Sequence, residues 1–372
     1  MTITYYAGKQ LHGLSTDNLP NNLQEGSTIL ETDTAKLDFI KGGWKELGRT
    51  TLGSAGDDIT VSGLVNKRYY MLLLDGKVTG VSRCWYRLNG DTTGTYSARQ
   101  SENGGADATY INRTEGMLVG GATSPAGDSF GITYISNYYI KEKLSLSSLI
   151  NNIATGAGTA PYRNEDVGKW ANTTDSISSI IAHNDDTGSW NTGSEVVVLG
   201  YDPTDTHTTN FWEELASVTS LTGGNVDSGT FTAKKYLWVQ FELIVNAYDS
   251  TNVVIQFNAD TAGNYANRIS QNGGADSTAV SQTSIATTIS GGKRIFGNMF
   301  IINNSANEKL VTGHTVVIGT SANSTAEGAG VAPRRLEFVG KWDNTSNQIT
   351  KIVFDDTIAN FVSGQVKVWG SN

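Results

Sequence analysis

Two stretches of the chain carry nearly the same sequence: Asn89–Thr109, NGDTTGTYSARQSENGGADAT, and Asn258–Thr278, NADTAGNYANRISQNGGADST. They align without a gap at an offset of 258 − 89 = 169 residues and are identical at 13 of 21 positions. A second pair of blocks repeats at an offset of 326 − 154 = 172 residues: Ala154–Trp170, ATGAGTAPYRNEDVGKW, and Ala326–Trp342, AEGAGVAPRRLEFVGKW. Matches of this density at nearly constant spacing indicate an internal duplication.

The length of the repeat is that of a whole domain, since the units of solenoids and propellers run about 20–50 residues. Shorter sequence matches extend the two copies: Lys67-Arg68-Tyr69 matches Lys234-Lys235-Tyr236, and Glu142-Lys143-Leu144 matches Glu308-Lys309-Leu310. We therefore predict two tandem homologous domains at residues 55–200 and 225–372. The linker at 201–224 includes a helix-like stretch at 210–218, and residues 1–54 form a separate N-terminal segment.

Each copy has the sequence pattern of an antiparallel β-sandwich. Tyr236–Val245 (YLWVQFELIV) is rich in aromatic and β-branched residues, and further strand-sized runs alternate with clusters of Gly, Asn and Ser. About seven or eight strands are expected in each copy, a number that favours a jelly-roll-like sandwich. The predicted fold class is all-β, with two tandem homologous antiparallel sandwiches after a small N-terminal β segment. That segment has expected strands at 27–33, 36–40 and 44–47.

The composition narrows the class of protein. Of 372 residues, 38% are hydrophobic and 17% are charged, with 42 glycines and 5 prolines, which suits strands joined by many tight turns. The net charge of −9 argues against a nucleic-acid partner, which a basic stripe would mark. The single cysteine, Cys84, excludes an intramolecular disulfide and a cysteine-based zinc cluster. The N-terminus has no signal-peptide pattern and the apolar runs are strand-sized, so we expect no membrane span.

The repeated Asn/Asp/Gly loops are the best candidate binding sites. Their side-chain oxygens, spaced two residues apart around glycines, suit calcium, while the Tyr and Arg of the same block suit a glycan or a subunit contact. The same residue types also stabilise turns by bonding their own backbone, and this interpretation is favoured. No cofactor is predicted, and calcium is kept as an alternative. The candidate binding residues are Asn89, Asp91, Tyr96, Arg99, Asn103 and Asp107, with Asn258, Asp260, Tyr265, Arg268, Asn272 and Asp276 in the second copy.

Catalytic motifs are weak in this sequence. Gly127–Gly131 (GDSFG) fits G-x-S-x-G, but a strand-like run follows where a nucleophile elbow needs a helix, so a turn before a strand is favoured. Asp185-Asp186 and Asp355-Asp356 are adjacent carboxylates, which point to opposite faces of a strand, and we expect solvated turns at strand ends. Trp170 and Trp342 are expected to anchor the cores. We predict neither a catalytic residue nor a metal ligand, and no enzymatic activity.

The N-terminal segment carries a motif of its own. Residues 11–47 contain Gly13-Leu14-Ser15-Thr16-Asp17, then Leu19-Pro20, then Glu31-Thr32-Asp33-Thr34 and Gly43-Trp44. This order resembles an N-terminal motif of virion structural proteins of tailed bacterial and archaeal viruses, which runs roughly GLSTDTxPT…G…ETDT…W. Asn18 and Asn21-Asn22 depart from that pattern. The tandem sandwiches with polar loops also look like phage fibre, decoration or turret modules. The resemblance implies a virion component more than any activity.

Together these features predict a non-enzymatic virion structural protein. It would be an exposed decoration, turret or fibre component, anchored by its N-terminus, assembled in the host cytoplasm and located in the virion. Expected partners are its own copies, as a trimer or pentamer, other virion proteins such as the major capsid protein, and a host-surface glycan. The alternatives are a jelly-roll capsid shell protein, and a carbohydrate-binding module or virion glycan depolymerase.

Overall fold

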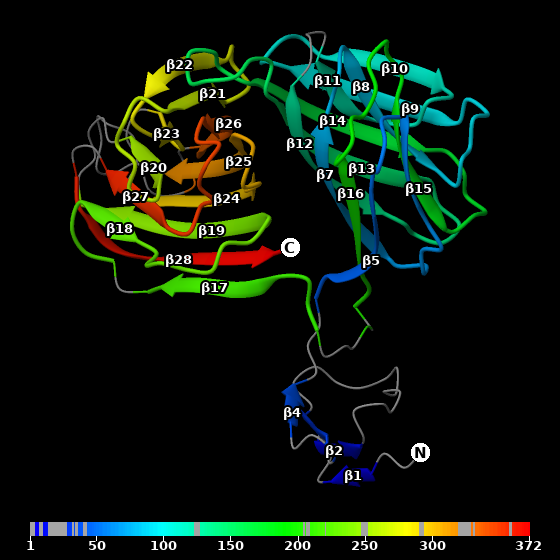
Figure 1. Ribbon diagram of the computed structural model, residues 1–372, viewed down its shortest axis with the longest axis horizontal. Coiled ribbons are helices and arrows are strands. Elements are labelled where there is room, and N and C mark those ends of the chain that lie inside the picture. Colours follow the sequence, from blue (N-terminus) through cyan, green and yellow to red (C-terminus); the bar gives the residue numbers. More distant parts are fainter. Residues whose placement is uncertain are drawn as a thin grey trace.

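The computed structural model describes residues 4–6, 10–13, 28–31, 33, 36–39, 43–122, 127–203, 205, 209–219, 221–246, 252–289, 294–318, 329, 332–356 and 359–372. Every regular element among these residues is a strand, so the predicted all-β fold class is confirmed. The strands form a small N-terminal sheet and two tandem sandwiches (Figure 1).

The strands of the two sandwiches follow one another along the chain. The first sandwich contains β5 (Lys45–Thr51), β6 (Asp58–Ser62), β7 (Tyr69–Lys77), β8 (Ser82–Leu88), β9 (Tyr96–Glu102), β10 (Ala108–Arg113), β11 (Met117–Ala122), β12 (Asp128–Ser136), β13 (Lys143–Asn151), β14 (Tyr162–Trp170), β15 (Ser179–Asn184) and β16 (Glu195–Tyr201). The second contains β17 (Glu213–Val218), β18 (Asn225–Asp227), β19 (Tyr236–Val245), β20 (Val253–Phe257), β21 (Tyr265–Gln271), β22 (Ser277–Gln282), β23 (Ile285–Ala286), β24 (Arg294–Ile302), β25 (Lys309–Ile318), β26 (Arg334–Trp342), β27 (Ile352–Asp356) and β28 (Phe361–Ser371).

Both sandwiches have the same topology. In the first, an eight-stranded sheet β10-β9-β14-β13-β12-β7-β16-β5 packs on a four-stranded sheet β11-β8-β15-β6. In the second, the orders β22-β21-β26-β25-β24-β19-β28-β17 and β23-β20-β27-β18 match these strand for strand. The chain switches repeatedly between the two sheets of each sandwich, as in a jelly roll. Each copy has more strands than expected, because edge strands such as β10 and β22 are largely exposed on both faces and lack an alternating apolar and polar pattern.

The first strand of each sandwich lies outside the predicted domain limits. β5 pairs with β16 and β17 pairs with β28 in the same register, with a bulge at the matching position. The sandwiches therefore begin near residues 45 and 213 rather than 55 and 225, and the expected helix-like stretch at 210–218 is wrong. Its Glu and Leu residues favour helix locally, but pairing with β28 overrides that propensity. Trp44–Leu47 (WKEL) and Trp212–Leu215 (WEEL) form a third repeated block that marked these strands in the sequence.

The N-terminal strands β1 (Thr4–Tyr6), β2 (Gln10–Gly13), β3 (Thr28–Glu31) and β4 (Lys36–Phe39) form a four-stranded sheet in chain order. β2 and β3 are parallel and the other pairs are antiparallel. β3 and β4 confirm the strands expected at 27–33 and 36–40, while the strand expected at 44–47 is the start of β5. Much of the virion-like motif, including residues 14–27, 32 and 34, lies outside the described residues.

The central strands of the first large sheet are buried on both faces. Along β7, Leu72 and Leu74 face the core between the two sheets, while Met71 and Leu73 belong to a second apolar cluster shared with the other sandwich. β16 has the same arrangement over 196–199. A strand covered on both sides is apolar at consecutive positions rather than at alternate ones. The runs MLLL at 71–74 and VVVL at 196–199 therefore reflect contact between the sandwiches.

Candidate functional site

The junction between the sandwiches is formed by the outer faces of the two large sheets (Figure 1). β12, β13 and β14 of the first sandwich lie against β24, β25 and β26 of the second. The buried apolar side chains of the junction are Met71, Leu73, Phe130, Ile132, Ile150, Val197 and Leu199 on one side, and Phe211, Trp212, Tyr236, Phe300, Ile302, Leu310 and Val339 on the other. An apolar centre of this kind is typical of a stable protein interface.

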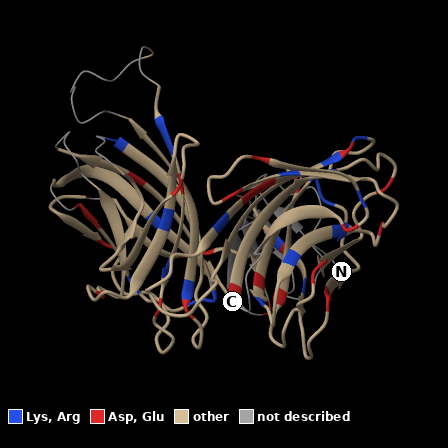
Figure 2. Ribbon diagram, turned by 90° about the horizontal axis from the view of Figure 1, so that it is seen from above, with Lys and Arg blue, Asp and Glu red and all other residues tan. Residues whose placement is uncertain are grey.

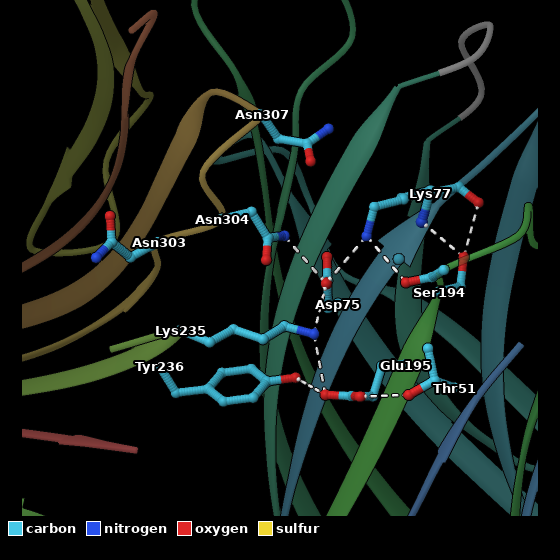
Figure 3. A network of polar contacts seen from close by, with 12 residues as sticks. Thr51, Asp75, Lys77, Ser194, Glu195, Lys235, Tyr236, Asn303, Asn304 and Asn307 are labelled. Atoms are coloured by element: carbon cyan, nitrogen blue, oxygen red, sulfur yellow. Dashed lines mark hydrogen bonds and ion pairs between the residues drawn. The ribbon is translucent and has the colours of Figure 1, made fainter. Parts of the chain in front are cut away.

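A polar network borders the apolar centre (Figure 3). The Nζ of Lys235 lies 3.0 Å from carboxylate oxygens of both Asp75 and Glu195, and the Tyr236 hydroxyl donates to Glu195 over 2.8 Å. Burial favours a raised pKa for Glu195, but hydrogen bonds from Thr51, Lys235 and Tyr236 outweigh it and hold the pKa below its ordinary value. Lys235 of the second sandwich thus adds to the charge compensation that Lys77 gives Asp75 and Arg49 gives Glu195 within the first.

A second polar cluster surrounds Lys341, whose side chain is completely buried. Its ammonium donates to the side chain of Asn152 over 2.9 Å and to the carbonyl of Ala154 over 2.6 Å, both in the first sandwich, and lies 3.5 Å from Glu308. Burial lowers the pKa of Lys341, and the nearby Glu308 carboxylate opposes that shift. The start of the repeated block 154–170 is therefore a junction element. Its counterpart at 326–331 lies almost entirely outside the described residues.

The second NGGAD loop also belongs to the junction. The Asp276 side chain is 1% exposed, and Arg163 of the first sandwich donates to it over 2.8 Å. Arg268 donates to the carbonyl of Pro161 over 2.9 Å. Two of the predicted binding residues, Arg268 and Asp276, are thus engaged by the first sandwich.

The first NGGAD loop has an open environment. Arg99 and Asp107 are about half exposed and lie 3.4 Å from each other. At Gly104, which has a φ of +70°, a Cβ atom would lie 2.5 Å from the Asp276 carboxylate, so glycine allows the close approach of the two loops there. Asn103 and Asn272 both have positive φ, and their side chains accept hydrogen bonds from the backbone N–H groups of residues 163 and 335. These two asparagines have the geometry of turn residues.

The remaining predicted site residues stabilise the fold in both copies. Asp91 accepts from the indole of Trp170 and Asp260 from that of Trp342, each over 2.7 Å. Partial burial favours a raised pKa for Asp91, but hydrogen bonds from Thr93, Thr95 and Trp170 outweigh it and lower the pKa to about 2. The hydroxyls of Tyr96 and Tyr265 bond the backbone of the preceding strand, and Asn89 and Asn258 accept from backbone N–H groups near residues 178 and 350. The expected Trp anchors are confirmed as buried.

The outer face of the first sandwich carries an apolar basin of about 810 Å³ next to the junction. Its floor is formed by β13, β14 and β12, and aromatic rings surround it. The larger lining side chains are Trp44, Tyr69, Tyr110, Ile111, Tyr134, Leu144, Leu146, Val167 and Tyr201. Leu144 and Leu146 are 56% and 61% exposed, which is unusual for neighbouring leucines on a monomer surface. No motif or hydrophobic periodicity in the sequence points to this basin.

The catalytic motifs do not assemble a site in the described residues. Ser129 is buried inside β12 and its hydroxyl lies 3.4 Å from the Gly76 carbonyl, so the strand–turn–helix context of a nucleophile elbow is not present at this serine. Asp185 and Asp186 follow the end of β15, as expected. Asp355 and Asp356 are instead the last residues of β27, with Asp356 buried, so the expectation of a solvated turn is wrong there.

Two further properties concern ions and membranes. Within the described ranges, no group of three or more His, Cys, Asp or Glu residues is arranged to hold a metal ion. No helix with the length and apolar character needed to span a membrane occurs in the part of the chain that the structure describes. Basic and acidic residues are interspersed over both sandwiches (Figure 2).

Comparisons with known proteins give little resemblance. Domains LG4-5 of the mouse laminin alpha1 chain align at 9% identity over 88% of this chain and 90% of that chain, with a TM-score of 0.15. The Sputnik virophage structure, determined at 3.5 Å by cryo-EM, aligns at 7% identity over 95% and 88% of the two chains, with a TM-score of 0.13. Similarities this low carry no argument about function. No family model and no curated protein matches the chain.

Proposed function

We propose that the protein is a non-enzymatic structural component of a virion, located on the particle as an exposed decoration, turret or fibre subunit. The observation that carries the structural role is the apolar basin on the first sandwich. Large exposed apolar surfaces that are rich in aromatic side chains are typical of protein–protein interaction sites. The basin is lined by exposed side chains such as Leu144, Leu146 and Val167, so it is available to a partner.

The structural contacts of the repeated polar loops support the same role. Asp91, Asp260 and Asp276 satisfy buried partners, and their carboxylates are therefore committed to structural contacts. The virion assignment itself rests on the N-terminal resemblance in residues 11–47. The small four-stranded sheet at this end is the proposed anchor, because so few residues provide little core of their own.

The test is localisation on particles. Virions purified from cells that encode this chain should contain it in stoichiometric amounts by mass spectrometry, and antibodies against the sandwiches should label intact particles. A variant without residues 1–42 retains all strands of both sandwiches and should stay folded but fail to incorporate. Normal incorporation of that variant would contradict the anchor, and the absence of the chain from particles would contradict the virion role.

The same experiments separate the alternatives. Density for the chain within the shell lattice, rather than on top of it, would support a capsid shell protein. Specific binding on a glycan array, or turnover of a glycan or an ester, would support the carbohydrate-binding or depolymerase function instead.

A further inference from the structure

The two sandwiches bury opposite ends of their large sheets in the junction. The end that is buried in one sandwich is exposed in the other. The strand registers define which residues are equivalent, because both sheets pair in the same order. The equivalent pairs that matter are Phe130 with Phe296, Ile150 with Val316, Tyr69 with Tyr236, Leu144 with Leu310 and Val167 with Val339. One member of each pair lies in the junction, and the other lies on the surface.

At one end of the sheet, the first sandwich supplies the junction residues. Phe130 and Ile150 are 1% and 0% exposed because the second sandwich covers them. Their equivalents Phe296 and Val316 are 51% and 38% exposed. We call this surface of the second sandwich, with Glu242 and Arg335, the open phenylalanine face.

At the other end, the second sandwich supplies the junction residues. Tyr236, Leu310 and Val339 are each 0% exposed. Their equivalents Tyr69, Leu144 and Val167 are 37%, 56% and 46% exposed and line the apolar basin. We call this surface of the first sandwich, with Arg68 and Asp107, the open tyrosine face.

The charges of the two open faces are complementary in the same way as those of the junction. In the junction, Lys235 pairs with Asp75 over 3.0 Å. The register places Arg68 at the position of Lys235 and Glu242 at the position of Asp75, so the two open faces carry a basic and an acidic residue at the positions that pair in the junction. Within the chain, Glu242 pairs with Arg294 of the same face.

A second ion pair of the junction also has residues of the same charge at the equivalent positions on the open faces. Arg163 and Asp276 pair in the junction over 2.8 Å. Their equivalents are Arg335, which is 65% exposed on the open phenylalanine face and pairs there with Glu337, and Asp107, which is 46% exposed at the edge of the open tyrosine face, where it pairs with Arg99 of the basin lining.

We infer that copies of this chain associate head to tail, with the open tyrosine face of one copy docked on the open phenylalanine face of the next. Each such contact repeats the geometry of the junction within the chain, with Arg68 against Glu242 and Asp107 against Arg335. The contact is heterologous, so it closes into a ring if the rotation between sandwiches closes and otherwise extends as a filament. The inference rests on the proposed function only in assigning the basin to a protein partner. A second copy is the expected partner, because its open phenylalanine face is equivalent to the surface that covers the matching residues in the junction.

The first experiment measures association of the purified full-length chain, without particles, by mass photometry and light scattering over a range of concentrations. We expect oligomers in the wild type. Leu144→Glu on the open tyrosine face and Phe296→Glu on the open phenylalanine face should each weaken association about a hundredfold or more, because an unpaired charge would be buried in the contact. Val65→Glu, at a residue that is 62% exposed and outside both faces, is the matched control and should leave association unchanged.

Mixing the two variants tests the head-to-tail geometry. Each variant keeps one intact face, so an equimolar mixture should form a one-to-one dimer that does not grow further. If each face instead bound the same face of another copy, each variant would still dimerise alone and mixing the two would not increase association. That result would overturn the inference.

A charge exchange distinguishes a lost contact from a misfolded variant, because a misfolded variant is not rescued by a second substitution. Arg68→Glu should weaken association about tenfold, and so should Glu242→Arg combined with Arg294→Glu, which keeps the ion pair of residues 242 and 294 within the chain. The variant with all three substitutions should recover association, because the contact between residues 68 and 242 is restored with reversed signs. A wild-type chain that remains monomeric at all concentrations, with an intact fold, would overturn the inference. That result would leave the virion role to be decided by incorporation into particles, which is measured separately.

Discussion

Leu144 and Leu310 are equivalent residues, both within a Glu-Lys-Leu sequence at the start of equivalent strands, yet one is on the surface and the other is completely buried. The same holds for Asp107 and Asp276 in their NGGAD loops. The strand order and register around them are the same, so the difference comes from the neighbouring sandwich and not from the local fold. Matched substitutions in the two copies therefore measure how much the junction contributes to the free energy of unfolding.

The largest difference is expected for the acidic residue of the NGGAD loops. Asp276→Ala removes the acceptor of two donors of the buried Arg163 guanidinium and leaves Glu165, at 2.9 Å, as its remaining carboxylate partner. It should lower the free energy of unfolding by about 3–5 kcal/mol, because the buried charge is then only partly compensated. Asp107→Ala removes an exposed pair and should cost about 0–1 kcal/mol. Urea unfolding followed by tryptophan fluorescence compares the two, and equal losses would show that the junction adds nothing at this position.

The leucine pair is expected to give the next effect. Leu310→Ala leaves a cavity in the apolar centre of the junction and should cost about 2–5 kcal/mol, while Leu144→Ala should change stability by about 0.5 kcal/mol or less at concentrations where the chain is monomeric. The same unfolding measurement applies. A similar loss in both variants would mean that Leu144 is buried in solution, and repeating it at several protein concentrations would show whether self-association is the reason.

Much of the fold could be predicted from the sequence, and the reason is the duplication. Two copies at a domain-sized offset, each with strand-sized runs, predict tandem sandwiches. The two boundaries differ from the prediction for separate reasons. The strand expected at 44–47 belongs to the first sandwich and not to the N-terminal segment, while Glu213 and Glu214 have the helical propensity that hides the first strand of the second sandwich. The repeat of Trp44–Leu47 in Trp212–Leu215 indicates that the two strands are equivalent.

The junction could not be predicted by the same argument. Asp107 and Asp276 share the sequence NGGAD, so nothing local distinguishes an exposed carboxylate from a buried one. The signals in the sequence are the consecutive apolar runs at 71–74 and 196–199, which indicate strands covered on both faces. The open basin gave even less signal, because its residues come from strands far apart in the chain.

Away from the junction the two copies should respond alike. Asp91→Ala and Asp260→Ala each remove the acceptor for a buried indole N–H, at 2.7 Å in both sandwiches. We expect each variant to lose about 1.5–3 kcal/mol of unfolding free energy, with the two losses equal within error. Thermal and urea unfolding provide the values. A loss confined to one copy would show that the equivalence of the two turns is only geometric.

The pH dependence of the Asp91→Ala loss is the smallest and most specific effect. Hydrogen bonds from Thr93, Thr95 and Trp170 lower the pKa of Asp91 from 3.8 to about 2 in the folded chain, against the opposing effect of its burial. A carboxyl group whose pKa is lower in the folded state stabilises the fold above its unfolded pKa, and this contribution is lost as the pH falls through the folded pKa. The difference in unfolding free energy between wild type and Asp91→Ala should therefore be constant above about pH 5 and shrink between about pH 4 and 2. Asp260 also has a lowered pKa, so Asp260→Ala should show a change in the same direction. A difference that persists unchanged down to pH 2 would mean that the Asp91 bonds do not depend on its charge, and the two turns would then be held by geometry alone.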